Sequence, residues 1–251
     1  MAAEFVLKLL KKRLFSSPAA FGITLEKHIN TVGARKVSAA ISRDIEDFDN
    51  DYADDQEYED QTAEVVGTVS QALSPLTGEE RGLLKKLSDY AAKASLRADC
   101  KAQTLINWLK THLRPGGQWN NERVILFTEY RATQKWLYDL LAREGFAEEG
   151  RLEMIYGGMA NDQREPIKAA FQAHPGESKV RILLATDAAS EGLNLQNHCS
   201  KLIHIEIPWN PNRMEQRNGR VDRHGQKADE VSIFHFVGQG FDSAKTSGKV
   251  G

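Results

Sequence analysis

The stretch VRILLATDAASEGLNLQ, residues 180–196, points to the fold because a mostly apolar run leads directly into a polar loop. An apolar run without polar alternation is typical of a parallel strand buried on both faces. Helical patterns lie between most runs of this kind, at 131–144, 161–172 and 212–223. The other runs are VILF at 124–127, LEMIY at 152–156, LIHIEI at 202–207 and VSIFHFV at 231–237. This alternation predicts an α/β fold with a parallel sheet flanked by helices.

The loops that follow the predicted strands are the most distinctive parts of the chain. They read FTEYR, YGGM, ATDAASEGLN and PWNPNR. In open parallel sheets, ligands bind beyond the carboxyl ends of the strands, where such loops meet. We therefore expect a ligand site at this edge of the sheet.

The segment QRNGRVDRHGQ, residues 216–226, is predicted to continue a helix that begins at Asn210 and Pro211, a pair typical of a helix start. At about 100° per residue, Met214 and Val221 face the sheet. Gly219 within this helix, at a cost of roughly 1 kcal/mol relative to alanine, indicates that another group approaches the backbone closely. The side turned away from the sheet carries Gln216, Arg220 and Arg223, with Arg213, Arg217 and His224 beside them.

Paired arginines suit a phosphate ligand, because the planar guanidinium donates two hydrogen bonds and keeps its charge. The alternative for these residues is an exposed basic helix that forms surface ion pairs. Trp209, just before the helix, could stack on a base or a nucleotide, but packing against the helix is the more expected arrangement.

The order of these motifs resembles that of superfamily 2 helicases. ATDAASEGLNLQ, followed by LIHIEIPWNPNRMEQRNGRVDRHGQ, is similar to motifs V and VI of the Swi/Snf-type ATPases. FTEYRAT at 127–133 is similar to motif IV, and YGGMANDQRE at 156–165 to the glycine-rich loop and helix that follow it. The ending RHGQ is similar to that of the Swi/Snf branch, and the pattern QRxGRxDRxGQ is most similar to its bacterial RapA-like members. The resemblance covers residues 120–240 and implies the second RecA-like lobe of a two-lobe motor, preceded by a helical linker or insertion region.

The resemblance also implies roles for individual residues. Arg220 and Arg223 match the arginine fingers that reach the γ-phosphate of ATP across the cleft between two lobes. Gln216, Gly192 and Asn194 match positions around the nucleotide, although Asn194 lacks the charge of the aspartate that some relatives carry. The residues that match contacts to the nucleic-acid backbone, where hydroxyls and amides hold phosphate without reading bases, are Thr128, Gly157 and Thr186.

Asp187 lies in the motif V loop. We expect it to orient that loop rather than act as a catalytic acid, and a simple turn residue is the alternative.

Two motifs of the resembled family do not occur in the sequence: there is no GxxxxGK[ST] loop for phosphate and no DEAH-like run for Mg²⁺. In that family both belong to a first RecA-like lobe, so the resemblance implies that this missing lobe mainly holds ATP with Mg²⁺. The implied activity is ATP-dependent translocation on double-stranded DNA or another nucleic acid, and we expect this chain to be inactive alone. The alternative is a docking module for nucleic acid or RNA polymerase without turnover of its own.

The phrase LKKRLFSSPAAF, residues 10–21, resembles linkers of bacterial members, some of which are tied to phage defence.

The formal net charge of -2 conceals an uneven distribution, because DIEDFDNDYADDQEYED at 44–60 carries ten acidic side chains and no basic one. Such repulsion favours an unstructured segment. Downstream, Thr77 and Glu80 form a predicted capping box that opens a helical stretch. The expected organisation is a helical inter-lobe segment at 1–43, an acidic unstructured insertion at 44–76, a helical segment at 77–117, the lobe at 118–242 and a tail at 243–251.

The spacing of the cysteine and histidine residues does not indicate a metal site. Cys100 and Cys199 have no metal-like spacing and suit a reducing compartment, and His198, His204 and His235 are expected to be structural. No apolar run approaches the roughly 20 residues needed to span a bilayer. A bacterial cytoplasmic protein is expected.

Overall fold

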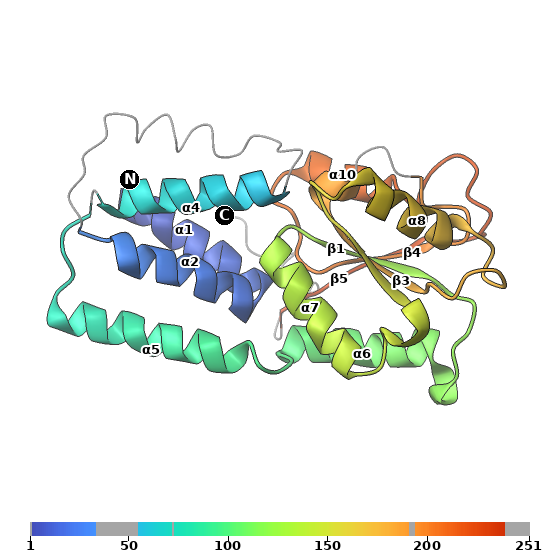
Figure 1. The fold of residues 1–251 in the computed structure, drawn as a ribbon, viewed down its shortest axis with the longest axis horizontal. Helices are drawn as coiled ribbons and strands as arrows, with labels where there is room; N and C mark the ends of the chain where they lie inside the picture. Colours follow the sequence, from blue (N-terminus) through green and yellow to red (C-terminus); the bar gives the residue numbers. More distant parts are fainter. Residues whose placement is uncertain (1, 34–54, 72, 191–193, 239–251) are drawn as a thin grey trace, which may run out of the picture.

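The computed structural model describes residues 2–33, 55–71, 73–190 and 194–238 of the chain. Its centre is a sheet of five parallel strands in the order β2-β3-β1-β4-β5 (Figure 1). The strands are β1 (Val124–Thr128), β2 (Leu152–Ile155), β3 (Ile182–Thr186), β4 (Lys201–His204) and β5 (Ser232–His235). The predicted parallel α/β sheet is confirmed, with one strand in each of the five apolar runs.

Helices cover both faces of the sheet (Figure 1). Successive strand residues point to opposite sides, so Leu126 of β1 packs with α6 and α7 while Phe127 packs with Phe171 of α8. Every residue of β1 and β3 is buried, which explains why their sequences show no polar alternation. The helices of the lobe are α6 (Cys100–Leu113), α7 (Arg131–Arg143), α8 (Asn161–Gln172), α9 (Asp187–Ser190) and α10 (Pro211–Asn218).

In the described part of the chain, four further helices pack together beside the lobe, in the blue to cyan-green part of Figure 1. The chain turns between the first two at Ser17, whose side chain caps the second helix by accepting from the amide of Ala20 at 3.0 Å. The predicted capping box at Thr77 is confirmed, since Thr77 and Glu80 bond each other's main-chain amides. These helices are α1 (Ala2–Ser16), α2 (Pro18–Thr31), α4 (Asp55–Gln71) and α5 (Gly78–Ala94).

The prediction that residues 44–76 are unstructured is wrong for residues 55–71, which form α4. This helix places Thr62, Val66, Val69 and Ser70 at helical spacing, and all four are buried. Their burial against α1 and α2 offsets the repulsion on which the prediction rested. Residues 44–54 and the expected tail at 243–251 lie outside the described residues.

Candidate nucleotide and nucleic-acid site

The helix α10 is shorter than its sequence predicts. Asn210 caps it as expected, by accepting from the amide of Asn212 at 3.0 Å, but the helix ends at Asn218 and Gly219 forms its C-cap. The predicted helical end at 223 is therefore wrong. A Cβ on Gly219 would contact only carbonyl oxygens of the helix itself, at 3.4 and 3.6 Å, and the φ of -62° at this position suits any residue, so within this chain neither a close contact nor the backbone conformation requires the glycine.

Residues 219–226, called here the arginine turn, are held by two anchors. Val221 is fully buried in the core beneath the sheet. The side-chain amide of Gln226 donates to the carbonyl oxygens of Cys199 at 3.0 Å and Val221 at 2.9 Å. Because Val221 points inward, the flanking chain places Arg223 at the surface and leaves Arg220 half-buried.

The arginine turn meets the end of the motif V loop. The amide of Leu195 donates to the carbonyl oxygen of Arg220 at 3.2 Å, and the guanidinium of Arg223 donates to the side-chain oxygen of Asn194. Asn194 and Arg223 are both exposed, as is Gln216 on α10. The structure thus brings Asn194, Arg220 and Arg223 together, while Gly192 lies outside the described residues.

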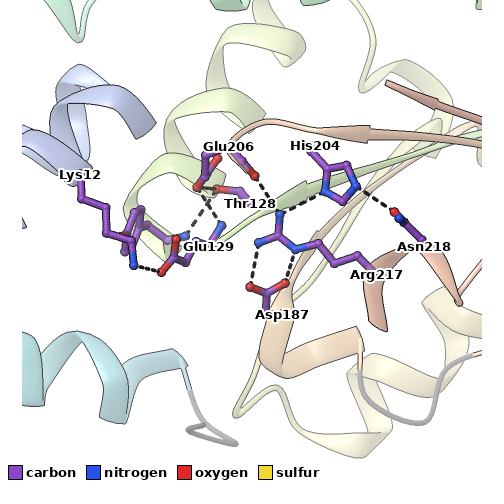
Figure 2. Close-up of polar contacts among 9 residues, drawn as sticks. Lys12, Thr128, Glu129, Asp187, His204, Glu206, Arg217 and Asn218 are labelled. Carbon is purple, nitrogen blue, oxygen red and sulfur yellow. Dashed lines mark hydrogen bonds and ion pairs between the residues drawn. The ribbon is translucent and has the colours of Figure 1, made fainter. Parts of the chain in front are cut away.

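Arg217 is the residue of this region whose buried environment the sequence did not predict. Its side chain is 1% exposed, whereas the sequence placed it beside the outward-facing arginines. Its guanidinium donates to both carboxylate oxygens of Asp187, at 2.5 and 2.7 Å (Figure 2). Met214, Arg217 and Val221 lie at positions i, i+3 and i+7, so the periodicity that assigned Met214 and Val221 to the core face also contained the signal for Arg217.

The ion pair fixes the charge of Arg217. Burial lowers the pKa of a guanidinium, but the carboxylates of Asp187, Glu206 and Glu129 together more than offset this, so the pKa of Arg217 lies above its ordinary value. Asp187 starts α9 directly after β3. The expectation that Asp187 orients its loop agrees with this contact, because it ties the motif V loop to α10.

His204, at the end of β4, completes the buried cluster. Arg217 can only donate, so its contact with His204 Nδ1 at 3.3 Å places the ring proton on Nε2, which donates to the side-chain oxygen of Asn218 at 2.9 Å (Figure 2). Burial, followed by the positive charge of Arg217, lowers the pKa of His204 to about 4. The ring is thus a neutral structural element, as its isolated position in a strand predicts.

The three residues that match nucleic-acid contacts lie at one edge of the sheet but are all buried. Thr128 and Thr186 end β1 and β3 and are register partners, and Gly157 follows β2. The Thr128 hydroxyl donates to Glu206 Oε1 at 2.8 Å rather than toward solvent. A phosphate can therefore contact the Thr128 hydroxyl only if the loop after β1 moves.

Trp209 does not pack against α10 as expected, because 72% of its side chain is exposed. It stands at the rim of a cavity of about 880 Å³ between α1, α6 and the ends of β4 and β5. The ammonium group of Lys12 lies 6.0 Å from the centre of its ring. An exposed aromatic ring at the ligand edge of a sheet is suited to stacking.

Among residues 2–33, 55–71, 73–190 and 194–238, no three His, Cys, Asp or Glu side chains come together as a metal-binding group. No helix within these ranges is both long and apolar enough to cross a membrane.

A five-stranded parallel sheet, with exposed Arg223 and half-buried Arg220 beside the motif V loop, is the arrangement expected of a second RecA-like helicase lobe. Residues 101–225 match the family described as "Helicase conserved C-terminal domain". The chain belongs to this family, as a C-terminal lobe of the Swi/Snf type in superfamily 2, and the resemblance stated from the motifs is confirmed.

Bacterial proteins are among the relatives of the chain. The chain is 39% identical over 117 residues to "Uncharacterized ATP-dependent helicase YqhH" of Bacillus subtilis, covering 47% of this chain and 19% of that protein. It is 33% identical over 132 residues to "RNA polymerase-associated protein RapA" of Vibrio vulnificus, covering 52% of this chain and 12% of RapA. The chain thus spans less than a fifth of either relative.

Among solved structures, "Crystal structure of the C-terminal part of Fun30 ATPase domain" aligns with a TM-score of 0.46 and 16% identity, covering 87% of this chain and 68% of that one.

Proposed function

We propose that this chain is the C-terminal motor lobe of an ATP-dependent translocase or remodeller of double-stranded nucleic acid. Its role is to present Arg220 and Arg223 to the γ-phosphate of an ATP that is held, with Mg²⁺, mainly by a first RecA-like lobe. The observation that carries the proposal is the arginine turn, in which buried Val221 and the Gln226 amide direct Arg223 outward beside Asn194.

The residues present suit a phosphate supplied from outside the lobe. Arg223 is exposed and its bond is to the neutral amide of Asn194, so a charged phosphate oxygen is the stronger acceptor. Gln216 and Asn194 are exposed nearby as neutral hydrogen-bonding groups for the nucleotide. Guanidinium groups at such a position neutralise the charge that develops on the phosphoryl group during transfer.

The edge formed by Thr128, Gly157 and Thr186 is the proposed nucleic-acid side of the lobe. Its residues are buried in this conformation, so we infer that the nucleic acid engages them when the loops move on closure of the two lobes. Backbone contacts of this kind do not depend on base sequence. Double-stranded DNA is the proposed substrate class.

The names of the relatives favour a second candidate function. Because RapA is described as RNA polymerase-associated, the chain could serve to dock its parent protein on RNA polymerase or nucleic acid without supplying turnover. Phage-defence components are proposed partners on the resemblance of residues 10–21 to linkers. The bacterial sources of the relatives support a bacterial cytoplasmic location as part of the same proposal.

Arginine substitutions in the intact protein distinguish these functions. Arg220→Ala and Arg223→Ala are each expected to lower DNA-stimulated ATP turnover by about 10³-fold or more, the usual contribution of an arginine finger. The KM for ATP is expected to change less than about threefold, because the first lobe holds most of the nucleotide. The control is Arg81→Ala, an exposed arginine of α5. Unchanged turnover in both variants refutes the finger assignment.

The isolated chain provides the complementary measurement. It is expected to hydrolyse no ATP with or without duplex DNA, and robust DNA-stimulated turnover would refute the two-lobe proposal. A steep fall in duplex binding with added salt, measured on the same sample without turnover, favours the docking function.

A further inference from the structure

A chain of hydroxyl groups runs from the α1–α2 junction to a carboxylate at the end of β4. Ser17 Oγ lies 2.7 Å from Thr133 Oγ1, which lies 2.5 Å from Ser16 Oγ, and Ser16 Oγ donates to Glu206 Oε1 at 3.0 Å. Each hydroxyl has one proton and an ionised carboxylate has none. The protons therefore point in one direction, from Ser17 through Thr133 and Ser16 to Glu206.

Glu206 also holds the loop after β1. Its Oε1 accepts from the Thr128 hydroxyl and from the amide of Glu129, both at 2.8 Å (Figure 2). Glu129 in turn forms an ion pair with Lys12 of α1 at 2.6 Å. One carboxylate oxygen thus joins the helical region, through Ser16, to the proposed nucleic-acid edge, through Thr128.

The main chain of Glu206 reaches the other functional element. Its carbonyl oxygen accepts from Arg217 Nη1 at 2.9 Å, and the same guanidinium is held by Asp187 (Figure 2). Arg217 lies on α10, directly before the arginine turn. Glu206 is therefore the residue at which the contacts of the helical region, the loop after β1 and the arginine turn meet.

We propose that Glu206 is a positioning residue that transmits the state of the nucleic-acid edge to the arginine turn. This inference rests on the proposed function, since it specifies how nucleic acid stimulates turnover. The Thr128 hydroxyl has one proton, which can be donated either to Glu206 or to a phosphate but not to both. Engagement of Thr128 by a phosphate removes one donor from Glu206, and the resulting shift of Glu206 moves the carbonyl that holds Arg217.

The test compares Glu206→Ala with Glu206→Gln in the intact protein, with duplex DNA and ATP. In Glu206→Ala the acceptor is lost, and we expect the DNA-stimulated kcat to fall about tenfold to a hundredfold, because displacements of about 1 Å can cost up to about 10²-fold. The DNA concentration for half-maximal stimulation should change less than about threefold. Glu206→Gln keeps an oxygen acceptor at the same position and should restore kcat to within about threefold of wild type.

The control is Glu122→Ala, which removes an acidic partner of Lys201 at the opposite end of β4 and should leave kcat unchanged. A folded Glu206→Ala protein with wild-type stimulation, or a Glu206→Gln protein as impaired as Glu206→Ala, overturns the proposal. If Glu206→Ala does not fold, Ser16→Ala removes a single donor. It should lower the stimulated kcat about two- to tenfold, and an unchanged kcat then overturns the proposal.

The Arg220→Ala variant, measured in the same assay, tests the proposed motor function separately from the positioning role of Glu206. Loss of turnover in Arg220→Ala together with full stimulation in Glu206→Ala refutes the positioning role and leaves the proposed function intact. Full turnover in Arg220→Ala and Arg223→Ala, or no stimulation of the wild-type protein by DNA, refutes both.

Discussion

The substitution Asp187→Ala tests whether the buried guanidinium of Arg217 depends on one carboxylate. In the native structure the two Asp187 oxygens accept from Arg217 at 2.5 and 2.7 Å. The variant leaves a buried cation with the Glu206 carbonyl oxygen and His204 Nδ1 as its remaining acceptors among these contacts. Removing one partner of a buried ion pair costs about 3–5 kcal/mol. The Asp187 side chain is 20% exposed, so water can enter the vacated space and the lower end, about 3 kcal/mol, is expected.

The assay is thermal unfolding of the chain followed by circular dichroism. At this chain length 1 kcal/mol shifts Tm by about 2–4 °C, so Asp187→Ala is expected to lower Tm by about 6–12 °C. The control Glu144→Ala removes a surface ion pair to Lys110 and should shift Tm by less than about 2 °C. The double variant Asp187→Ala/Arg217→Met also removes the cation, and it should be more stable than Asp187→Ala.

A Tm for Asp187→Ala within about 2 °C of wild type contradicts the reasoning. So does a double variant that is less stable than the single one.

The pKa of His204, lowered to about 4, predicts that the free energy of unfolding falls as pH decreases from about 6.5 to 4, because the unfolded chain then binds a proton that the folded chain does not. His204 contributes at most about 1.4 kcal/mol per pH unit to the slope of the unfolding free energy against pH. Urea titrations should therefore give a smaller slope for His204→Gln than for the wild-type chain, and equal slopes contradict the lowered pKa of His204. Burial raises the pKa of the Cys199 thiol to about 12, so a maleimide should label exposed Cys100 rapidly and Cys199 only on unfolding. Rapid labelling of both thiols in the native protein refutes that assignment.

The sheet could be predicted from sequence because both of its faces are covered. Burial on both sides requires apolar residues at successive strand positions, and β1 and β3 show this directly. The placement of Arg220 and Arg223 beside the motif V loop could likewise be predicted, because the ordered motifs around them are specific. The end of α10 could not be derived from helical periodicity alone, since the anchoring of Val221 and Gln226 is tertiary.

The contacts around Glu206 were beyond sequence reasoning for a different reason. Ser16 and Glu206 are separated by 190 positions, and neither residue occurs in a pattern that specifies a partner. The exposure of Trp209 and the burial of α4 also depend on which surfaces meet in three dimensions. Local patterns predict elements and faces, whereas the pairing of distant polar side chains follows from the packed arrangement.

The distance along the chain between Ser16 and Glu206 has a consequence for biosynthesis. At about 5–20 residues per second, the 190 positions between them take about 10–40 s to translate. Helix formation takes about a microsecond, so α1 and α2 can form helical turns long before Glu206, which follows β4, leaves the ribosome. During this interval Phe15, which is 75% exposed even in the folded chain, and the apolar residues around it have no lobe to contact. The α1–α2 junction is therefore open to chaperones and proteases during this interval.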